Sequence, residues 1–418
     1  MCNICTYNGV KYLTHQVLRS SNTVGHRKIN SVNLMRRLCG NVSFINNAFM
    51  LTTRRFLSST SSSLQLSYKD NYMNNSNNHN NQSNEPRHLL SIADLSNSEL
   101  KVLIHNALRN KTTIKSNGVL PQHLRGSLIG KTVAMMFSKR STRTRVSTEG
   151  AVAALGGHPM FLGSSDIQLG VNESLHDTAK VISSMSAALI ARVNAHSEVT
   201  DLAKCSSVPV INALSNDFHP FQSITDFLTL TEVFADKNGR EKNINDFKNN
   251  FDSLCGLKIA WVGDSNNVLF DLAIGAMKLG VNISVASPVG YEIPASLRQL
   301  IVSANTTGAI FEETNVAEEA IKGADVIVTD TWISMGQEKE AEKRLQDFAG
   351  FQVTEDLARR GGAKPHWKFM HCLPRHQDEV DDSVFYGHRS LVFPEAENRL
   401  WAAISVLEAF IVNKGIIS

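Results

Sequence analysis

Acidic residues are absent from the first 69 positions of this 418-residue sequence. The same stretch carries nine Lys and Arg, is rich in Ser and Asn, and lacks the uninterrupted apolar core of a secretory signal. An acid-free N-terminus rich in Arg and Ser is typical of a mitochondrial transit peptide. We therefore expect residues 1–60 to be a transit peptide and the mature protein to lie in the mitochondrial matrix. A disordered cytosolic tail is the alternative.

Long apolar runs are also absent, since no stretch reaches the ~20 residues that a membrane-spanning helix needs. Without residues 1–69 the chain has 33 basic and 39 acidic residues, a net charge of −6. A mildly acidic body has no surplus of positive charge to attract a phosphate backbone. We expect neither a membrane nor a nucleic acid as partner.

Cysteine is scarce, and its spacing suits neither a disulfide framework nor a zinc site. The six cysteines divide between the leader (Cys2, Cys5, Cys39) and the remaining chain (Cys205, Cys255, Cys372). An odd number of widely spaced cysteines without a Cys-x-x-Cys pair argues against both. No set of His and carboxylate residues has metal-ligand spacing either, so we expect no metal and no other cofactor.

Composition divides the chain into segments. An Asn-rich stretch at 61–85 buries nothing and is expected to be a disordered linker. Apolar runs then alternate with helical patterns over 86–234 and again over 253–392. A charged stretch at 235–252 looks like a surface insertion, and residues 393–418 end the chain with a helix.

Apolar strands between helices indicate parallel sheets covered on both faces. The expected strands are 131–137, 159–162, 188–193 and 208–213, then 257–262, 281–286, 325–329 and 368–372. The expected helices run from Ser96 or Ser98 to Leu108, then over 143–155, 174–185, 197–204, an amphipathic 220–234, 267–279, 294–305, 316–321 and 397–412. The fold class is therefore α/β, with two doubly wound parallel-sheet domains around a shared cleft and the last helix returning to the first domain.

Hydroxyl side chains and arginines lie between a predicted strand and the start of the helix that follows it. Residues 132–137 form an apolar run, Ser141-Thr142-Arg143-Thr144 follow, and the helix pattern ends at Gly156-Gly157. Unpaired N–H groups and the positive end of the helix dipole favour an anion there. The Gly-x-x-x-x-Gly-Lys spacing of a Walker loop is absent. A solvated basic helix start is the alternative.

Other polar clusters follow other strands and thus fall at the same edge of the predicted sheets. They are Arg192, residues 217–222, residues 264–267, residues 330–336 and residues 371–375, with Arg399 expected at the start of the last helix. Each has a plain structural alternative: a surface ion pair for Arg192, a helix cap for His219, a small buried apolar residue for Cys372. Residues 263–267 lack the Gly-x-Gly-x-x-Gly spacing, which argues against a nicotinamide site.

Four motifs together resemble the ornithine carbamoyltransferases, of the mitochondrial type, over residues 86–412. They are Ser-Thr-Arg-Thr-Arg at 141–145, His-Pro-x-Gln at 219–222, Asp-Thr-Trp-x-Ser-Met-Gly at 330–336 and His-Cys-Leu-Pro at 371–374. The first motif is shared with the aspartate enzymes, whereas the last two select the ornithine branch. The aspartate branch carries a phosphate-binding Lys in a loop that corresponds to residues 166–170, where this chain has none.

The resemblance implies transfer of a carbamoyl group from carbamoyl phosphate to L-ornithine, and roles for particular residues. Carbamoyl phosphate would contact Ser141, Thr142, Arg143, Thr144, Gln168, Arg192, His219, Gln222, Cys372, Leu373 and Arg399. Ornithine would contact Asn267, Asp330, Ser334 and the backbone of Met335. Cys372, Asp330, Arg192 and His219 would act in catalysis, with Cys372 accepting the proton of the amine or orienting it through Asp330. Gln168 would reach a neighbouring subunit, because the family is trimeric.

Two alternatives remain. The chain could carbamoylate another amine, such as putrescine or an acylated ornithine, although residues 330–336 suit a free amino acid. It could also have kept the fold but regulate a partner such as arginase. Every catalytic position of the family pattern is filled, which argues against loss of catalysis.

Overall fold

The computed structural model describes residues 85–166, 173–234, 251–333 and 338–418. The predicted transit peptide, nearly all of the Asn-rich linker and most of the predicted insertion at 235–252 lie outside these residues. Within the described ranges, no helix is long and apolar enough to cross a membrane.

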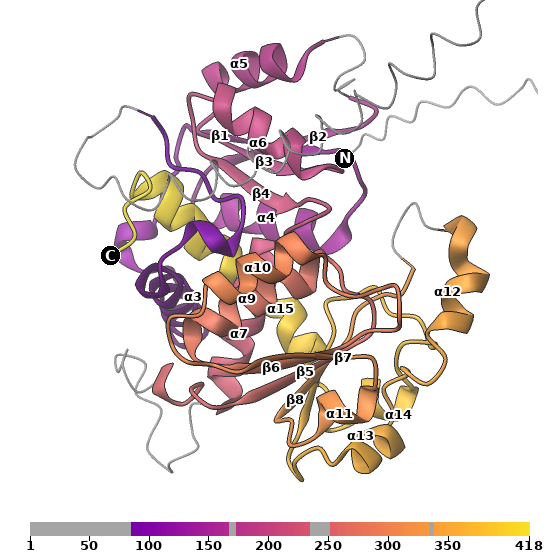
Figure 1. Cartoon of the computed structure of the whole chain (residues 1–418). Helices are drawn as coiled ribbons and strands as arrows, with labels where there is room; N and C mark the ends of the chain where they lie inside the picture. Colours follow the sequence, from indigo (N-terminus) through magenta and orange to yellow (C-terminus); the bar gives the residue numbers. More distant parts are fainter. Residues whose placement is uncertain (1–84, 167–172, 235–250, 334–337) are drawn as a thin grey trace, which may run out of the picture. The chain divides into compact units, whose positions relative to one another are not determined.

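The first half forms a four-stranded parallel sheet, with strand order β2-β1-β3-β4. The strands are β1 (Thr132–Phe137), β2 (His158–Gly163), β3 (Ala188–Arg192) and β4 (Val210–Leu214). The helices are α3 (Asn97–Asn117), α4 (Thr142–Ala154), α5 (Leu175–Met185), α6 (His196–Cys205) and α7 (Pro220–Phe234) (Figure 1). All four expected strands are confirmed to within two residues at each end.

The second half forms a five-stranded parallel sheet, with strand order β7-β6-β5-β8-β9. The strands are β5 (Lys258–Val262), β6 (Asn282–Ala286), β7 (Phe311–Thr314), β8 (Val326–Val328) and β9 (Lys368–Met370). The helices are α9 (Asn267–Leu279), α10 (Ala295–Ser303), α11 (Ala317–Ile321), α12 (Ala341–Asp347), α13 (Glu355–Gly361), α14 (Asp382–Phe385) and α15 (Val392–Leu407) (Figure 1). The predicted fold class, two parallel-sheet α/β domains, is confirmed.

Four short elements of this half were not predicted: β7, α12, α13 and α14. Each has seven residues or fewer. Such a segment spans too few turns or alternations to show a hydrophobic period, so only its tertiary partners reveal it.

Helix α3 continues nine residues beyond the predicted end at Leu108. Its start is as expected, because Ser96 and Glu99 form a capping box. The added residues have no apolar period, and they are held instead by polar contacts: Arg109 and Asn110 donate to Glu408 at 2.9 and 2.8 Å. The helix ends where Gly118 takes the left-handed conformation, with φ 72°.

Helix α7 has the predicted bounds but is not amphipathic, because buried residues lie on all its faces. It packs against β4, α3, α9 and α15 and thus has neighbours on every side. Gly275 of α9 lies so close to Phe227 that an added Cβ would stand 2.4 Å from the ring. This close contact brings a second-half helix against a first-half helix.

Helix α15 begins at Val392, five residues before the predicted start, so Arg399 lies inside the helix rather than at its start. Pro394 falls in the first turn, where a proline costs no hydrogen bond. The helix packs against α3, α4 and α7 of the first half, and a π-helical segment (Glu408–Val412) continues it. It therefore carries Arg399 into the interior.

Candidate active site

The first sheet changes winding direction between β1 and β3, which are neighbours in space with β2 and β4 outside them. Such a switch point is where open α/β sheets bind ligands. Phe137, the last residue of β1, pairs in register with Arg192, the last residue of β3. Arg192 and the segment that leads to the predicted anion site at 141–144 therefore lie next to each other at the same edge of the sheet, as the sequence predicted.

The second sheet has its switch point between β5 and β8. Asn266 follows β5 and caps α9, accepting from the N–H groups of Val268 and Leu269. Its amide nitrogen donates to Asp330 Oδ2, just beyond β8, at 2.8 Å. Asp330 is thus positioned by the neighbouring strand end.

At the start of α4, Ser141 is the N-cap and its hydroxyl accepts from Thr144 N at 3.2 Å. The first N–H groups of a helix have no partner within it, so those of Thr142 and Arg143 are available to an anion. The Arg143 guanidinium donates to the carbonyl of Leu373 in the second half. The two predicted motifs, 141–144 and 371–374, are therefore in direct contact.

Arg399 is the centre of a buried network. Its guanidinium donates to Thr144 Oγ1 at 3.0 Å and to Gln222 Oε1 at 3.0 Å, and it lies 3.4 Å from His219 Nε2. Burial lowers the pKa of Arg399 to about 10, which leaves it charged at pH 7. Three of the predicted carbamoyl-phosphate residues, from two separate segments, thus meet at the guanidinium of a third.

Arg192 and His219 are buried and each keeps an unused nitrogen. Arg192 Nε and His219 Nδ1 have no hydrogen-bond partner. Burial, together with the charge of the nearby Arg143, lowers the pKa of Arg192 to about 10, so Arg192 stays protonated at neutral pH. Burial, with Arg399, Arg192 and Arg143, holds the pKa of His219 well below its usual range. A buried polar atom left unsatisfied is costly, which is the state expected where a ligand completes the bonding.

The backbone of His219 is fixed from the second half. Its N–H donates to Asp271 Oδ2 of α9 at 2.8 Å. The other oxygen of Asp271 accepts from Ser91 Oγ and Ile92 N at 2.7 and 2.9 Å. This carboxyl ties together the chain before α3, the start of α7 and α9.

Cys372 donates its thiol to Asp330 Oδ1 at 3.0 Å. Although part of the residue is exposed, the thiol lies among packed side chains. Desolvation and then the charge of Asp330 raise the pKa of the Cys372 thiol well above its usual range, so the group is protonated. A protonated thiol orients Asp330 but does not accept a proton, which favours the second of the two roles predicted for it.

His371 is held through both of its ring nitrogens. Its Nδ1 accepts from Leu373 N at 2.9 Å and its Nε2 lies 3.0 Å from Glu379 Oε2. An acceptor role at Nδ1 places the proton on Nε2, facing the carboxylate. Leu373 takes a left-handed backbone, φ 63°, that turns its carbonyl to Arg143.

The other predicted residues are placed as follows. Thr142 is exposed at the start of α4, and Asn267 donates to the carbonyl of Ser215 at 2.5 Å, across the two halves. Gln168, Ser334 and Met335 lie outside the described residues.

Sequence reasoning missed four carboxyl groups that hold the predicted residues: Asp271, Glu379, Asp226 and Glu395. One signal was available for Asp226. It is one of two charged residues in α7, whose other positions are mostly apolar or hydroxyl-bearing, and a charge among such residues indicates a specific partner.

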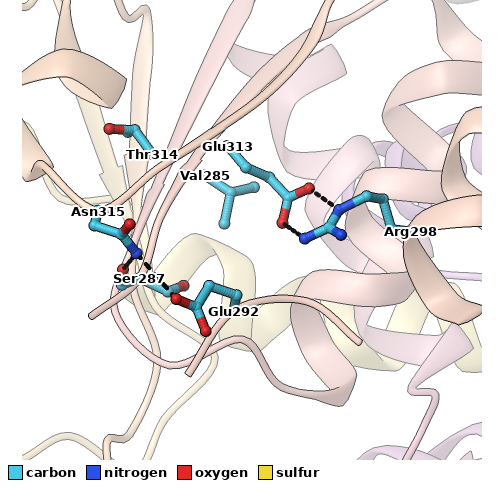
Figure 2. A pocket seen from close by; sticks show the side chains of 7 residues that line it. All are labelled: Val285, Ser287, Glu292, Arg298, Glu313, Thr314 and Asn315. Atoms are coloured by element: carbon cyan, nitrogen blue, oxygen red, sulfur yellow. Dashed lines mark hydrogen bonds and ion pairs between the residues drawn. The ribbon is translucent and has the colours of Figure 1, made fainter. Parts of the chain in front are cut away.

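A separate hollow of about 310 Å³ lies beyond the ends of β6 and β7, away from the β5/β8 switch point (Figure 2). Its charged side chains already have partners: Arg298 pairs with Glu313, and Glu292 accepts from the amide of Asn315 at 3.3 Å. We assign it no role. Among the described residues, no group of three His, Cys, Asp or Glu could hold a metal ion.

Two family models match the chain and together cover most of the described part. Residues 87–232 match the carbamoyl-phosphate-binding domain of the aspartate/ornithine carbamoyltransferases, and residues 255–410 match their aspartate/ornithine-binding domain. The chain belongs to the aspartate/ornithine carbamoyltransferase family.

Relatives within this family confirm the predicted resemblance to the mitochondrial ornithine carbamoyltransferases. It is 63% identical over 335 residues to the mitochondrial ornithine carbamoyltransferase of Aspergillus niger, covering 79% of this chain and 88% of the relative. The crystal structure of the mitochondrial ornithine carbamoyltransferase from Coccidioides immitis matches with a TM-score of 0.72 at 60% identity, covering 80% of this chain and 100% of that one. The enzyme from Pyrococcus furiosus matches with a TM-score of 0.70 at 42% identity, over 80% and 99%.

Proposed function

We propose that the cluster at the two switch points is the active site at which this chain transfers the carbamoyl group of carbamoyl phosphate to the δ-amine of L-ornithine, giving L-citrulline and phosphate. One observation carries this assignment to these residues. Three arginines, Arg143, Arg192 and Arg399, gather near Cys372, and two buried nitrogens, Arg192 Nε and His219 Nδ1, have no protein partner. A doubly charged anion with a reactive carbonyl is a ligand that such a group of donors suits.

The phosphate of carbamoyl phosphate is held by Ser141, Thr142, Arg143 and Thr144 at the start of α4. The N–H groups of the first helical turn and the planar guanidinium bind phosphate oxygens together. Gln168 is assigned to the same ligand from a neighbouring subunit. The departing phosphate needs no metal ion here, because the arginines already neutralise its charge.

The carbamoyl group lies against Arg192, His219, Gln222 and Arg399, with Cys372 and Leu373 on the other side. Arg192, His219 and Arg399 are the donors for the carbonyl oxygen, whereas Gln222 presents its amide oxygen, because both of its N–H groups are already used. Such donors stabilise the negative charge of the tetrahedral intermediate, and loss of one typically costs ~3 kcal/mol of barrier. Neutral His219 fits this role because it adds no repulsion among three arginines.

Ornithine is held by its amino-acid end. Asn267 and the backbone of Met335 take the carboxylate, while Asp330 and Ser334 take the α-ammonium, which leaves the δ-amine facing the carbonyl. The amine lone pair attacks the carbonyl carbon, the bond between that carbon and the phosphate oxygen breaks, and the proton that the amine loses passes to the departing phosphate. Alignment of two reactants in this way can lower a barrier by up to ~7–11 kcal/mol.

A citrulline-formation assay on the purified chain tests the function directly. We expect turnover with L-ornithine, and none with aspartate, putrescine or an acylated ornithine. Turnover with putrescine instead would favour the alternative acceptor. A chain that binds arginase but forms no citrulline would favour the regulatory alternative.

Two further parts of the proposal concern assembly and location. We propose a homotrimer, since Gln168 is assigned to a neighbouring site, and sedimentation of the purified chain measures its mass. We propose the mitochondrial matrix because residues 1–69 contain no acidic residue. A reporter fused to residues 1–70 that stayed in the cytosol would contradict this placement.

The rate should rise from neutral toward alkaline pH. The attacking amine must be neutral, and its pKa in solution lies near that of lysine, ~10.4. His219 does not add a second pH-dependent step to this profile near its ordinary pKa, because burial and the arginines keep it neutral. Measurement of kcat/KM for ornithine against pH checks this, and a flat profile would contradict attack by a deprotonated amine.

A further inference from the structure

A single side-chain amide lies between two buried carboxyl groups behind the site. Gln222 Nε2 donates to Asp226 Oδ1, one turn along α7, and to Glu395 Oε1 in the first turn of α15, both at 2.8 Å. All three residues are at most 3% exposed. An amide nitrogen has two hydrogens, so both are used by this pair of carboxyls.

Asp226 and Glu395 are also hydrogen-bonded to each other. Two carboxylates repel, and a bond between them requires that one carries a proton. Burial raises the pKa of both, that of Asp226 to about 7 and that of Glu395 well above its usual range. The charged groups around the pair are Arg399, Asp330 and, as a thiol, Cys372. One guanidinium does not neutralise two carboxylates and Asp330 together, which is why the pair keeps a proton.

The N–H donors indicate which carboxyl carries it. Glu395 Oε1 accepts from Gln222 and Glu395 Oε2 accepts from His371 N at 3.0 Å, so both of its oxygens receive an N–H. Asp226 receives one, at Oδ1. The O–H oxygen of a carboxylic acid is a poor acceptor, which leaves Asp226 Oδ2 as the oxygen suited to bear hydrogen. Burial and then repulsion by Asp226 raise the pKa of Glu395. The hydrogen bond between the two carboxyls also raises the pKa of Glu395 and lowers that of Asp226, which by itself favours Glu395 as the carrier. We place the proton on Asp226 because the N–H donors already occupy both oxygens of Glu395.

We propose that Asp226 and Glu395 are positioning residues that share one proton, carried by Asp226 and donated to ionised Glu395. The pair acts on the site through two contacts. It fixes the Gln222 amide so that Oε1, not the nitrogen, faces Arg399 at 3.0 Å. It also holds the N–H of His371, and so the segment that carries Cys372 and Leu373. The inference rests on the function proposed above, since it concerns how that site is kept in shape.

Two near-isosteric amide variants show which of the two carboxyls carries the proton. Asp226→Asn places an N–H where we place the O–H, so we expect kcat/KM for carbamoyl phosphate within about threefold of wild type, whereas Asp226→Ala loses it. Glu395→Gln must turn its own N–H toward either the Gln222 amide or the His371 N–H. Two donors then face each other with no acceptor between them. A buried donor without an acceptor costs about 1–3 kcal/mol, so we expect a loss of roughly 10- to 100-fold.

Glu408→Gln is the matched control. Glu408 is also buried at the end of the same helix, and its two oxygens accept from Arg109 and Asn110, but it contacts no site residue. It should lower the melting temperature and leave kcat/KM unchanged when all proteins are assayed well below melting. Equal losses in Asp226→Asn and Glu395→Gln, or the reverse order, would overturn the proposal. Absence of citrulline formation in the wild type would instead refute the proposed function.

Discussion

Arg143→Ala should lower kcat/KM for carbamoyl phosphate by about 1,000-fold. Arg143 is the residue of the α4 start whose guanidinium also bonds to the carbonyl of Leu373, so its loss removes a phosphate donor and a contact between the two halves. Loss of one preorganised donor costs ~10²–10³ in rate, and an arginine that also positions the opposite segment lies at the upper end. Steady-state kinetics with carbamoyl phosphate varied at saturating ornithine measure the effect.

Arg145→Ala provides the control within the same helical turn. Arg145 is about half exposed, pairs with Glu149 at 2.9 Å and stacks on Phe161 at 3.8 Å from the ring centre. An exposed pair of this kind contributes little to stability. We expect activity within about threefold of wild type. Equal losses of kcat/KM in the two variants would mean that carbamoyl phosphate is bound by the general positive charge of this helical turn rather than by Arg143 in particular.

Asp330→Ala should raise KM for ornithine and lower kcat/KM for it by about 100-fold or more. Its two oxygens accept from Asn266 and Cys372 at 2.8 and 3.0 Å, and it is the carboxylate that we assign to the α-ammonium. A buried carboxylate that binds a cation typically contributes ~2–5 kcal/mol when its partner is desolvated. Kinetics with ornithine varied, together with a binding titration of carbamoyl phosphate alone, separate the two substrates.

Asp325→Ala is the matched control, since Asp325 lies at the opposite end of β8 and pairs with Lys364. It should lower the melting temperature and leave the kinetics of ornithine unchanged. A defect of Asp330→Ala confined to carbamoyl phosphate would contradict the role assigned to it. A defect in both substrates of equal size would indicate that Asp330 mainly supports the segment around Cys372.

Much of the fold followed from short-range pattern. The strands 132–137, 188–192 and 258–262 are continuous apolar runs, and such runs between helical patterns have few other interpretations. The start of α3 was fixed by Ser96 and Glu99 alone. Two features that the hydrophobic pattern predicted wrongly depend on tertiary contacts. The end of α3 depends on Glu408, some 300 residues away, and α7 is buried all round because three helices and a strand surround it.

The residues that we assign to the site were named from the sequence, whereas most of the groups that hold them in place were not. Arg143, Arg192, His219, Gln222 and Arg399 were named from strand ends and motifs, and the structure brings them together around two switch points. Asp271, which fixes the backbone of His219, and Glu379, which fixes His371, belong to no local pattern and act across the fold.

The sequence by itself determined the class of fold and the family, and it predicted the edge of each sheet at which we propose the active site. This was possible because strand periodicity and motif spacing are local properties of the chain. Only the tertiary structure decided that β1 adjoins β3 and β5 adjoins β8, that Cys372 is a thiol directed at Asp330, and that Asp226 and Glu395 meet at one amide. Strand order and protonation both depend on which distant groups become neighbours, and burial among those neighbours sets the free energy of each charge.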